Sequence, residues 1–296
     1  GWELQIGWRD QIGDFKYGAK LSLSDSQSKI LRYGNPTGSL SKYVEGELIG
    51  NIYGYTTIGI AKTDEEMQQH LASLPNGGQS ALGSQWAAGD IMYADLNGDG
   101  KINNGSYTIN DMGDMKKIGN STPRFMTGIN LDAAYKGWDL QMFWQGVLKR
   151  DWWPGDKNMT FWGVTDGEWW STSFKEHLDY FRTSENPLGE NLNSYYPRPI
   201  FNTKNNKSQT RYLQNAAYMR LKNIQVGYTF PKVWINKLML QNLRIFVSGE
   251  NLLTITSLSD TMDPETCGAG YQSTEQANGT VYPLAKTISF GLSVNF

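Results

Sequence analysis

An acidic, glycine-containing segment has the residue spacing of a calcium-binding loop. It reads Asp-Leu-Asn-Gly-Asp-Gly-Lys-Ile-Asn, with side-chain oxygens at loop positions 1, 3 and 5 and glycine at position 6. In an EF-hand-like loop these oxygens and the backbone carbonyl of position 7 bind the cation. The spacing predicts a structural Ca²⁺ site formed by Asp95, Asn97, Asp99, Lys101 and Asn103. No other cofactor is expected.

The match departs from an EF-hand at loop position 12, which normally supplies a bidentate carboxylate. Ser106 stands there, although Asp111 or Asp114 could fold back to supply the ligand. The alternative is a turn rich in Asn, Asp and Gly that holds no ion. Both interpretations stay open at the level of sequence.

A group of aromatic side chains in the segment 149–216 forms a second candidate site. Aromatic faces stack on sugar rings, and Trp and Tyr are enriched where proteins dock. The group could contact a ligand or a partner protein, or it could form a small core of the segment itself. Its members are Trp152, Trp153, Phe161, Trp162, Trp169 and Trp170.

No catalytic arrangement is evident. Ser248 and Ser293 lie in strand-like patterns without a partner histidine, and His177 favours a structural role. No glycine-rich phosphate loop follows a strand, and the pair Asp95 and Asp99 is better explained as ion ligands. The sequence therefore predicts that the protein is not an enzyme.

Composition narrows the class of protein further. The 296 residues include 27 Lys and Arg against 29 Asp and Glu, which argues against a nucleic-acid partner. Cys267 is the single cysteine, and His70 and His177 lie far apart, so a zinc site is not expected. No apolar run approaches the roughly 18 residues of a transmembrane helix, but strands that alternate could still cross a membrane as a β-barrel. The chain begins with Gly1, and we expect a processed chain or a fragment.

Seven segments alternate between apolar and polar residues with the period of two that predicts β-strands. In the segment 217–230 the pattern is less clean: Tyr218, Arg220, Lys222 and Ile224 are expected on one face, and Ile224 continues it with Val226 and later residues. A helix is indicated near 63–74, where Thr63 could cap, and one or two helical turns could lie within 233–241. The predicted strands cover 1–10, 15–25, 124–135, 138–148, 217–230, 243–255 and 287–296.

Short turns alternate with long loops along the chain. The turns fall near 11–13, 136–137 and 231–241, and the loops cover about 25–122, 149–216 and 257–283. This organisation is typical of an outer-membrane barrel, whereas long loops without secondary structure are uncommon in compact soluble domains. The alternative is a soluble sandwich. A barrel presents its apolar face outward to lipid, and a sandwich buries the same residues.

Six segments, in order along nearly the whole chain, carry a family resemblance. The most distinctive is GDIMYADLNGDGKIN at 89–103, and the others are 116–147, 185–199, 213–231, 243–256 and 282–296. Together they resemble the SusC/RagA family of TonB-linked outer-membrane transporters of Bacteroidetes.

The resemblance implies an all-β fold: an antiparallel transmembrane barrel of about 22 strands closed around a plug. Residues 1–296 would be the C-terminal third of such a protein, about seven strands, with the plug and the N-terminal barrel segment absent. The long loops would be extracellular. Phe296 would be the terminal signal that the barrel-assembly machinery reads.

The resemblance also implies a function: uptake of oligosaccharides or peptides across the bacterial outer membrane. The partners would be a SusD-like surface lipoprotein, the lipid bilayer, and TonB acting through the absent plug. A soluble, secreted carbohydrate-binding β-protein remains the alternative. An adhesin with a barrel anchor would need a passenger domain, for which the sequence gives no sign.

Overall fold

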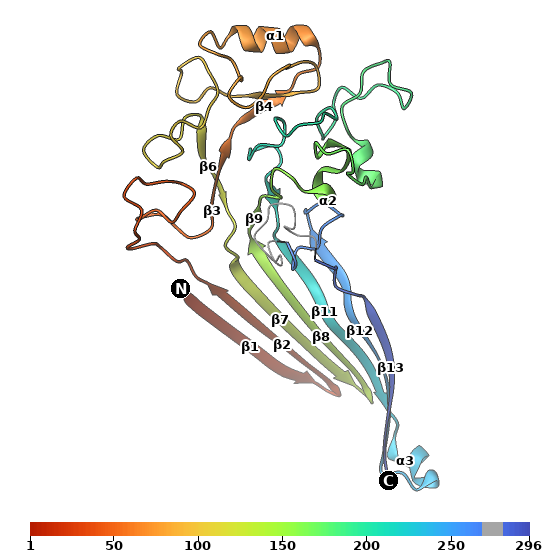
Figure 1. Ribbon diagram of the computed structural model, residues 1–296. Coiled ribbons are helices and arrows are strands. Elements are labelled where there is room, and N and C mark those ends of the chain that lie inside the picture. Colours follow the sequence, from red (N-terminus) through yellow and green to blue (C-terminus); the bar gives the residue numbers. More distant parts are fainter. Residues whose placement is uncertain (268–280) are drawn as a thin grey trace.

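The computed structural model describes residues 1–267 and 281–296. One antiparallel sheet of seven strands has a layer of loops across one end (Figure 1). This loop layer consists of the described residues of three long connections, 26–123, 150–217 and 257–286. The strands of the sheet follow in the order β1 (Trp2–Ile12), β2 (Phe15–Asp25), β7 (Arg124–Tyr135), β8 (Trp138–Lys149), β11 (Tyr218–Thr229), β12 (Asn242–Thr256) and β13 (Thr287–Asn295). The predicted seven antiparallel strands are confirmed.

Short connections join the strands at the end opposite the loop layer. Gly13 and Asp14 link β1 to β2, and Lys136 and Gly137 link β7 to β8. Lys136 and Gly137 both have positive φ, of 45° and 89°, which suits the right-handed twist of a two-residue hairpin. The third connection holds α3 (Lys232–Ile235) and the 3₁₀ turn η3 (Asn236–Leu238), the helical turns expected from the sequence.

The register of the strands places apolar side chains in continuous rows across one face of the sheet. One row runs Ile6–Leu21–Ile129–Trp144–Leu221–Leu253 through six strands. Many of these apolar side chains are open to the surroundings: Trp8 is 65 % exposed, Leu292 66 % and Phe290 81 %. A sandwich would bury these residues against a second sheet, and no second sheet among the described residues covers this face.

The height of the apolar face fits a membrane. At about 3.4 Å per residue, the step from Trp2 to Ile12 covers about 34 Å along the strand. A tilt of about 40° reduces this to about 26 Å, close to the apolar band of about 25 Å of outer-membrane barrels.

A β-bulge in β11 explains the irregular pattern of that strand. The pairing shifts between Leu221 and Asn223: Lys222 is an extra residue relative to β8, whereas two residues of β12, Asn251 and Leu252, lie opposite it. The expectation that Arg220 and Ile224 share a face is therefore wrong. Ile224 pairs with Met142 of the apolar face, whereas Arg220 points to the polar face, as the partners of its side chain show.

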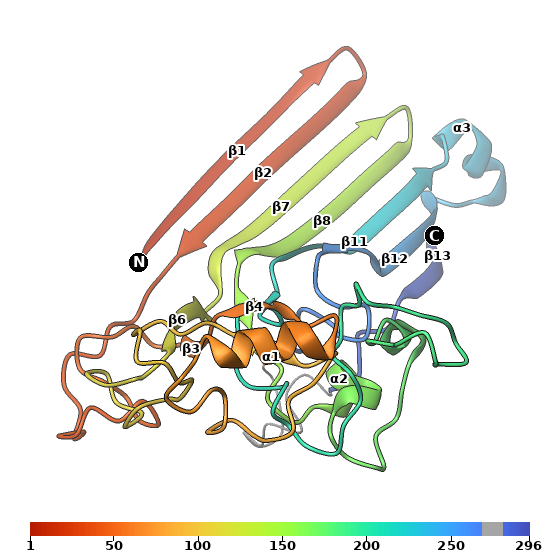
Figure 2. The same ribbon diagram turned by 90° about the horizontal axis from the view of Figure 1, so that it is seen from above.

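The loop layer has secondary structure of its own (Figure 2). The helix α1 (Asp64–Ala72) begins where predicted, because Thr63 Oγ1 accepts a hydrogen bond from Glu66 N at 3.2 Å. Three two-stranded ladders had no counterpart in the sequence analysis. They pair β3 (Asn51–Tyr55) with β6 (Met115–Asn120), β4 (Thr57–Ile60) with β5 (Ile91–Tyr93), and β9 (Asp151–Trp152) with β10 (Gln214–Asn215).

Short helical turns complete the layer in the second long connection. They are α2 (Met159–Trp162), η1 (Gly163–Thr165) and η2 (Lys175–Leu178). Asn158 caps α2, since its Oδ1 accepts from Phe161 N at 3.1 Å. These turns bring the aromatic residues of the segment together.

Candidate functional site

The loop layer contains a buried aromatic core. Trp152 is 2 % exposed, and Phe161 and Trp162 are fully buried. Their rings meet edge to face, with centroids 4.8 Å apart for Phe161 and Trp162, and 4.8 Å for Trp162 and Tyr212. For these three predicted site residues the structure gives the core alternative, because a buried ring cannot touch a ligand or partner while the layer stays folded.

The remaining tryptophans of the predicted site lie closer to the surface. Trp153 is half-buried against Trp162. Trp169 and Trp170 are 79 % and 53 % exposed, and their rings meet edge to face at 5.2 Å. Of the six predicted aromatic residues, these two offer the most exposed faces to a ligand or partner, so the binding prediction now rests on this pair.

A buried ionic cluster joins the first long connection to the second. Asp90 is fully buried; its carboxylate accepts from Arg198 Nε at 2.8 Å and from Asn205 Nδ2 at 2.9 Å, and Lys204 Nζ lies 2.8 Å away. Burial alone would raise the pKa of Asp90, but these donors outweigh it and hold the pKa below its ordinary value. The two connections are therefore one structural unit.

A second ionic cluster holds the described start of the third long connection, between β12 and β13, against the polar face of the sheet. Arg220, nearly buried, donates to both carboxylate oxygens of Asp263 at 2.9 Å and to Glu265 at 2.7 Å. Lys222, the extra residue of the bulge, reaches the same Glu265 at 3.1 Å. The bulge thus places two cations side by side for this connection.

The side chains of the predicted calcium loop accept backbone hydrogen bonds. Asp95 accepts from Gly98 N at 2.7 Å and from Gly100 N at 2.9 Å. Asn97 accepts from Asp99 N at 2.9 Å, and Asp99 from Lys101 N at 3.2 Å. Asn103 Oδ1 does the same for Gly105 N at 2.7 Å. Such turns were the ion-free alternative, and Ca²⁺ binding stays a prediction.

Asp114, not Asp111, folds back onto this loop. Its carboxylate is fully buried and accepts from Leu96 N at 2.9 Å and Asn103 N at 2.8 Å. Burial raises the pKa of Asp114, and the nearby Asp95 adds to the effect. Asp111 instead accepts from Ser106. Within 1–267 and 281–296, no group of three or more His, Cys, Asp and Glu side chains that could hold a metal ion is found.

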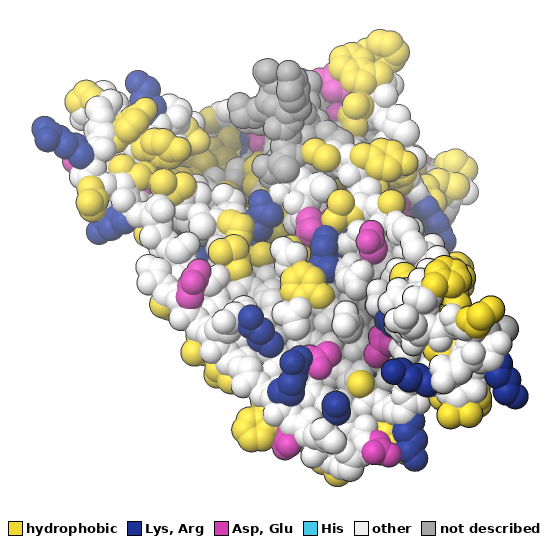
Figure 3. All heavy atoms as spheres, turned by 90° about the horizontal axis from the view of Figure 1, so that it is seen from below, with side chains coloured by type: hydrophobic (Ala, Val, Ile, Leu, Met, Phe, Trp, Pro, Cys, Tyr) yellow, Lys and Arg dark blue, Asp and Glu magenta, His cyan; other side chains and the backbone are white. Residues whose placement is uncertain are grey.

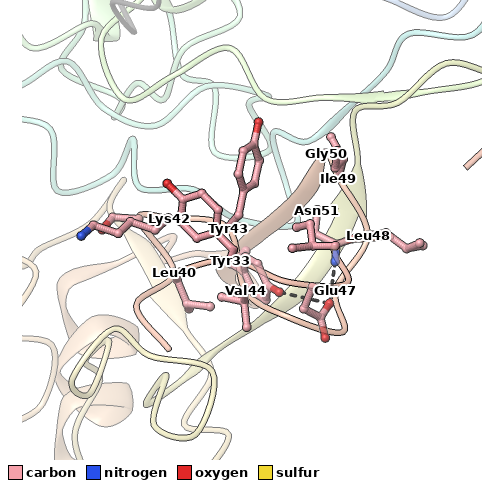
Figure 4. A pocket seen from close by; sticks show the side chains of 13 residues that line it. Tyr33, Leu40, Lys42, Tyr43, Val44, Glu47, Leu48, Ile49, Gly50 and Asn51 are labelled. Atoms are coloured by element: carbon pink, nitrogen blue, oxygen red, sulfur yellow. Dashed lines mark hydrogen bonds between the residues drawn. The ribbon is translucent and has the colours of Figure 1, made fainter. Parts of the chain in front are cut away.

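A cavity of about 350 Å³ opens between the segment after β2 and β3 (Figure 4). Tyr33 and Tyr43 line it, 5.4 Å apart and edge to face, and both are partly exposed. Glu47 accepts from Asn51 Nδ2 at 2.6 Å and from Lys117 Nζ at 2.9 Å. The Lys117 ammonium holds the pKa of Glu47 below its ordinary range. The cavity offers aromatic faces beside a fixed carboxylate.

The residues considered for catalysis have structural surroundings. His177 is buried beside Phe174 and Tyr196, and its Nδ1 accepts from Phe174 N at 2.9 Å. Burial lowers its pKa, so the imidazole is neutral. Ser248 and Ser293 lie on strands β12 and β13.

The polar face of the sheet carries charged pairs that reach across a middle strand. Arg9 on β1 contacts Asp132 on β7 at 2.9 Å over Gly18 of β2, where a Cβ would lie 2.6 Å from the carboxylate. Seen from the end of the short turns, charged side chains of both signs are spread over the middle of the molecule (Figure 3). Arg244 and Asp139 repeat this arrangement over Gly227 of β11 at 3.0 Å.

A sheet with one exposed apolar face of membrane height and one charged face has the properties of a wall segment of a membrane-spanning β-barrel with a polar interior. None of the helices in the described part of the chain has the length and apolarity to span a membrane.

The sequence is similar to two receptors of Formosa agariphila. It is 30 % identical to TonB-dependent receptor P3 and 24 % identical to TonB-dependent receptor P39, in each case over the whole of this chain. The chain spans 28 % and 30 % of the lengths of these relatives. No protein-family model matches. The chain belongs to the TonB-dependent receptors, as the resemblance predicted.

Solved structures support the fold. A structure of the RagAB peptide transporter matches 99 % of this chain and 29 % of its own chain, with a TM-score of 0.65 and 18 % identity. The RagAB peptide importer in an open-open state gives a TM-score of 0.59 at 17 % identity. The all-β, antiparallel barrel-type fold is thereby confirmed.

Two features of the site have no signal in the sequence. Asp90 and Arg198 are 108 positions apart, and nothing local marks them as partners. The sequence also does not indicate that Tyr33 and Tyr43 are exposed, because aromatic residues are frequent along the chain. For Lys222, the break in alternation was the available sign of the bulge.

Proposed function

We propose that this chain forms the C-terminal part of the barrel of an outer-membrane nutrient importer. The observation that carries the proposal is the exposed apolar face of membrane height backed by a face of charged pairs. Membership of the TonB-dependent receptors supports it. Energy would enter through the partner protein TonB, which would act on a plug in the rest of the receptor.

The loop layer would lie outside the cell and would face the incoming nutrient. The first two long connections and the described residues of the third lie at one end of the sheet and the short connections at the other, the arrangement of barrels whose long loops are extracellular. The layer would work with a SusD-like surface lipoprotein. The substrates would be oligosaccharides or peptides; the name of the RagAB transporter supports peptides for that protein.

The exposed pair Trp169 and Trp170 is the proposed contact for ligand or lipoprotein. Exposed aromatic faces stack on sugars and fill pockets of partner proteins, and truncation of such anchors typically costs more than about 1 kcal/mol. Their position outside the aromatic core leaves them free for this role without unfolding of the layer.

The test uses the full-length receptor in its own outer membrane. Trp169→Ala combined with Trp170→Ala is expected to lower uptake of labelled oligosaccharide or peptide at least about tenfold, the change that corresponds to about 1.4 kcal/mol. Phe201→Ala is the matched control, since Phe201 is a single aromatic of the same connection and is 82 % exposed. Equal uptake by both variants would remove the pair from the proposal.

Two further readouts separate the parts of the proposal. Co-purification of a surface lipoprotein with the wild-type receptor, reduced in the tryptophan variant, would assign the pair to the partner rather than to the nutrient. Recovery of the full-length receptor in the soluble fraction without detergent would contradict the membrane location and favour the secreted carbohydrate-binding alternative.

A further inference from the structure

The connection between β11 and β12 differs from the other two short turns. It contains α3 and η3, and it exposes three large apolar side chains: Val233 at 77 %, Trp234 at 61 % and Met239 at 87 %. Ile235 is buried and fixes the helical turn in place. In Figure 1, α3 projects past the ends of the strands, away from the loop layer. A short connection could join the strands without these exposed groups.

The apolar face of the sheet continues onto this turn. Near the short turns, aromatic side chains occupy one row of the register, made up of Phe15, Tyr135, Trp138 and Tyr228. From this row a chain of ring contacts leads outward: Trp138 to Tyr228 at 4.9 Å, Tyr228 to Phe230 at 5.1 Å, and Phe230 to Trp234 at 6.4 Å.

The aromatic row fixes the level of the turn relative to a bilayer. Outer-membrane barrels carry aromatic girdles where the hydrocarbon meets the headgroups. Phe230 stands two residues beyond Tyr228, which is about 7 Å further along the strand. The turn therefore begins at the level of the headgroups, on the lipid side of the sheet.

The charge and the backbone of the turn agree with this level. Lys232 and Lys237 are exposed, and no Asp or Glu occurs between Phe230 and Leu243. Met239 has a φ of +57°, a left-handed conformation that glycine would adopt with less strain. This strain is the same in water and at a membrane, but the exposed apolar side chain of Met239 is unfavourable in water and favourable at an apolar boundary.

We propose that the turn from Pro231 to Gln241 is an interfacial anchor that binds the phospholipid surface at the short-turn end of the barrel. Trp234, Val233 and Met239 enter the boundary between acyl chains and headgroups, and the two lysines contact lipid phosphates. The inference rests on the outer-membrane placement proposed above. Figure 3 shows hydrophobic and lysine or arginine side chains together on the side where α3 projects.

The test places a fluorescent label at three positions of the full-length receptor in phospholipid nanodiscs. Each variant carries one new cysteine, at Trp234, at Ile6 or at Asn104, in a Cys267→Ala background. Ile6 lies on the apolar face and reports lipid, whereas Asn104 is exposed in the loop layer and reports water. Lipids with spin labels near the headgroup and aqueous iodide serve as the two quenchers.

The label at Trp234→Cys is expected to be quenched by the lipid probe at least twofold more than the label at Asn104→Cys, and to be protected from iodide. Equal quenching at these two positions would overturn the proposal. If the label at Ile6→Cys is also quenched only by iodide, the membrane placement itself is wrong. The two failures are therefore distinguishable.

A second measurement tests the lysines. Lys232→Glu with Lys237→Glu should lower the lipid quenching at Trp234→Cys in nanodiscs with anionic phospholipid, with a smaller change in zwitterionic ones. Identical quenching in both lipids would contradict the phosphate contacts. Iodide access at Trp234→Cys in both lipids would point to a protein partner for this turn and would overturn the anchor.

Discussion

The sheet and the loop layer place tryptophans such as Trp8 and Trp162 in opposite environments. In the sheet Trp8 is 65 % exposed and the charged pairs lie on the opposite face, whereas in the loop layer Trp162 is fully buried within an aromatic core. Burial of apolar surface stabilises the loop layer through its own side chains, and in the proposed membrane placement lipid would cover the apolar face of the sheet. One chain therefore contains a sheet whose apolar face is open and a layer with its own core.

The largest effect is expected where the loop layer depends on one buried charge. Asp90→Asn leaves Arg198 and Lys204 without their carboxylate, which should cost about 3–5 kcal/mol of local stability. Hydrogen exchange of the segments 84–93 and 198–209 in the full-length receptor would measure it. Glu65→Gln, an exposed carboxylate on α1, is the control. Unchanged protection would show that the two connections fold independently.

A matched pair of substitutions on one strand tests the two faces of the sheet. Leu131→Arg puts a charge on the apolar face and should cost about 2–4 kcal/mol in a bilayer, while Asn130→Arg on the polar face should cost less than about 1 kcal/mol. Denaturant unfolding of the full-length receptor in lipid vesicles measures both. Similar costs at both positions would contradict the assignment of the faces.

The calcium prediction concerns the loop layer alone. If Ca²⁺ binds the loop at 95–103, a free concentration of about 100 times Kd should stabilise the layer by about 2.7 kcal/mol. Calorimetric titration of the receptor after chelation measures the binding. Asp114→Asn should weaken it and Glu190→Gln should not. Absence of any binding heat would leave the backbone hydrogen bonds as the whole explanation of the loop.

The smallest effect should come from pH. Burial holds the pKa of His177 below its unfolded value of about 6.5, so its contribution to stability is complete above about pH 6.5 and is lost as the pH falls further. Protection of residues 158–180 from hydrogen exchange, corrected for intrinsic rates, should fall between about pH 7.5 and pH 5. His177→Phe should remove this dependence, and His70→Gln should keep it. A wild-type layer with constant protection would refute the prediction.

The difference between the two regions also decides what the sequence could predict. The alternation of apolar and polar residues predicts the strands directly, and the capping residue Thr63 predicts the start of α1. The bulge at Lys222 was visible only as a disturbed pattern. The aromatic core was one of several interpretations of the tryptophans, because residue type does not state which rings are inside. The ionic cluster at Asp90 depends on contacts between distant segments, which have no local pattern.

The charged pairs that cross a middle strand have a mechanical consequence. A backbone ladder connects each strand to its neighbour, but Arg9 with Asp132, and Arg244 with Asp139, connect strands two places apart. Ion pairs of this kind oppose the sliding of one strand along the next. Because the diameter of a closed barrel depends on its strand number and shear, such pairs would help a barrel that contains this sheet to keep its diameter. Gly18 and Gly227, which have no side chain to obstruct them, make these ion pairs sterically feasible.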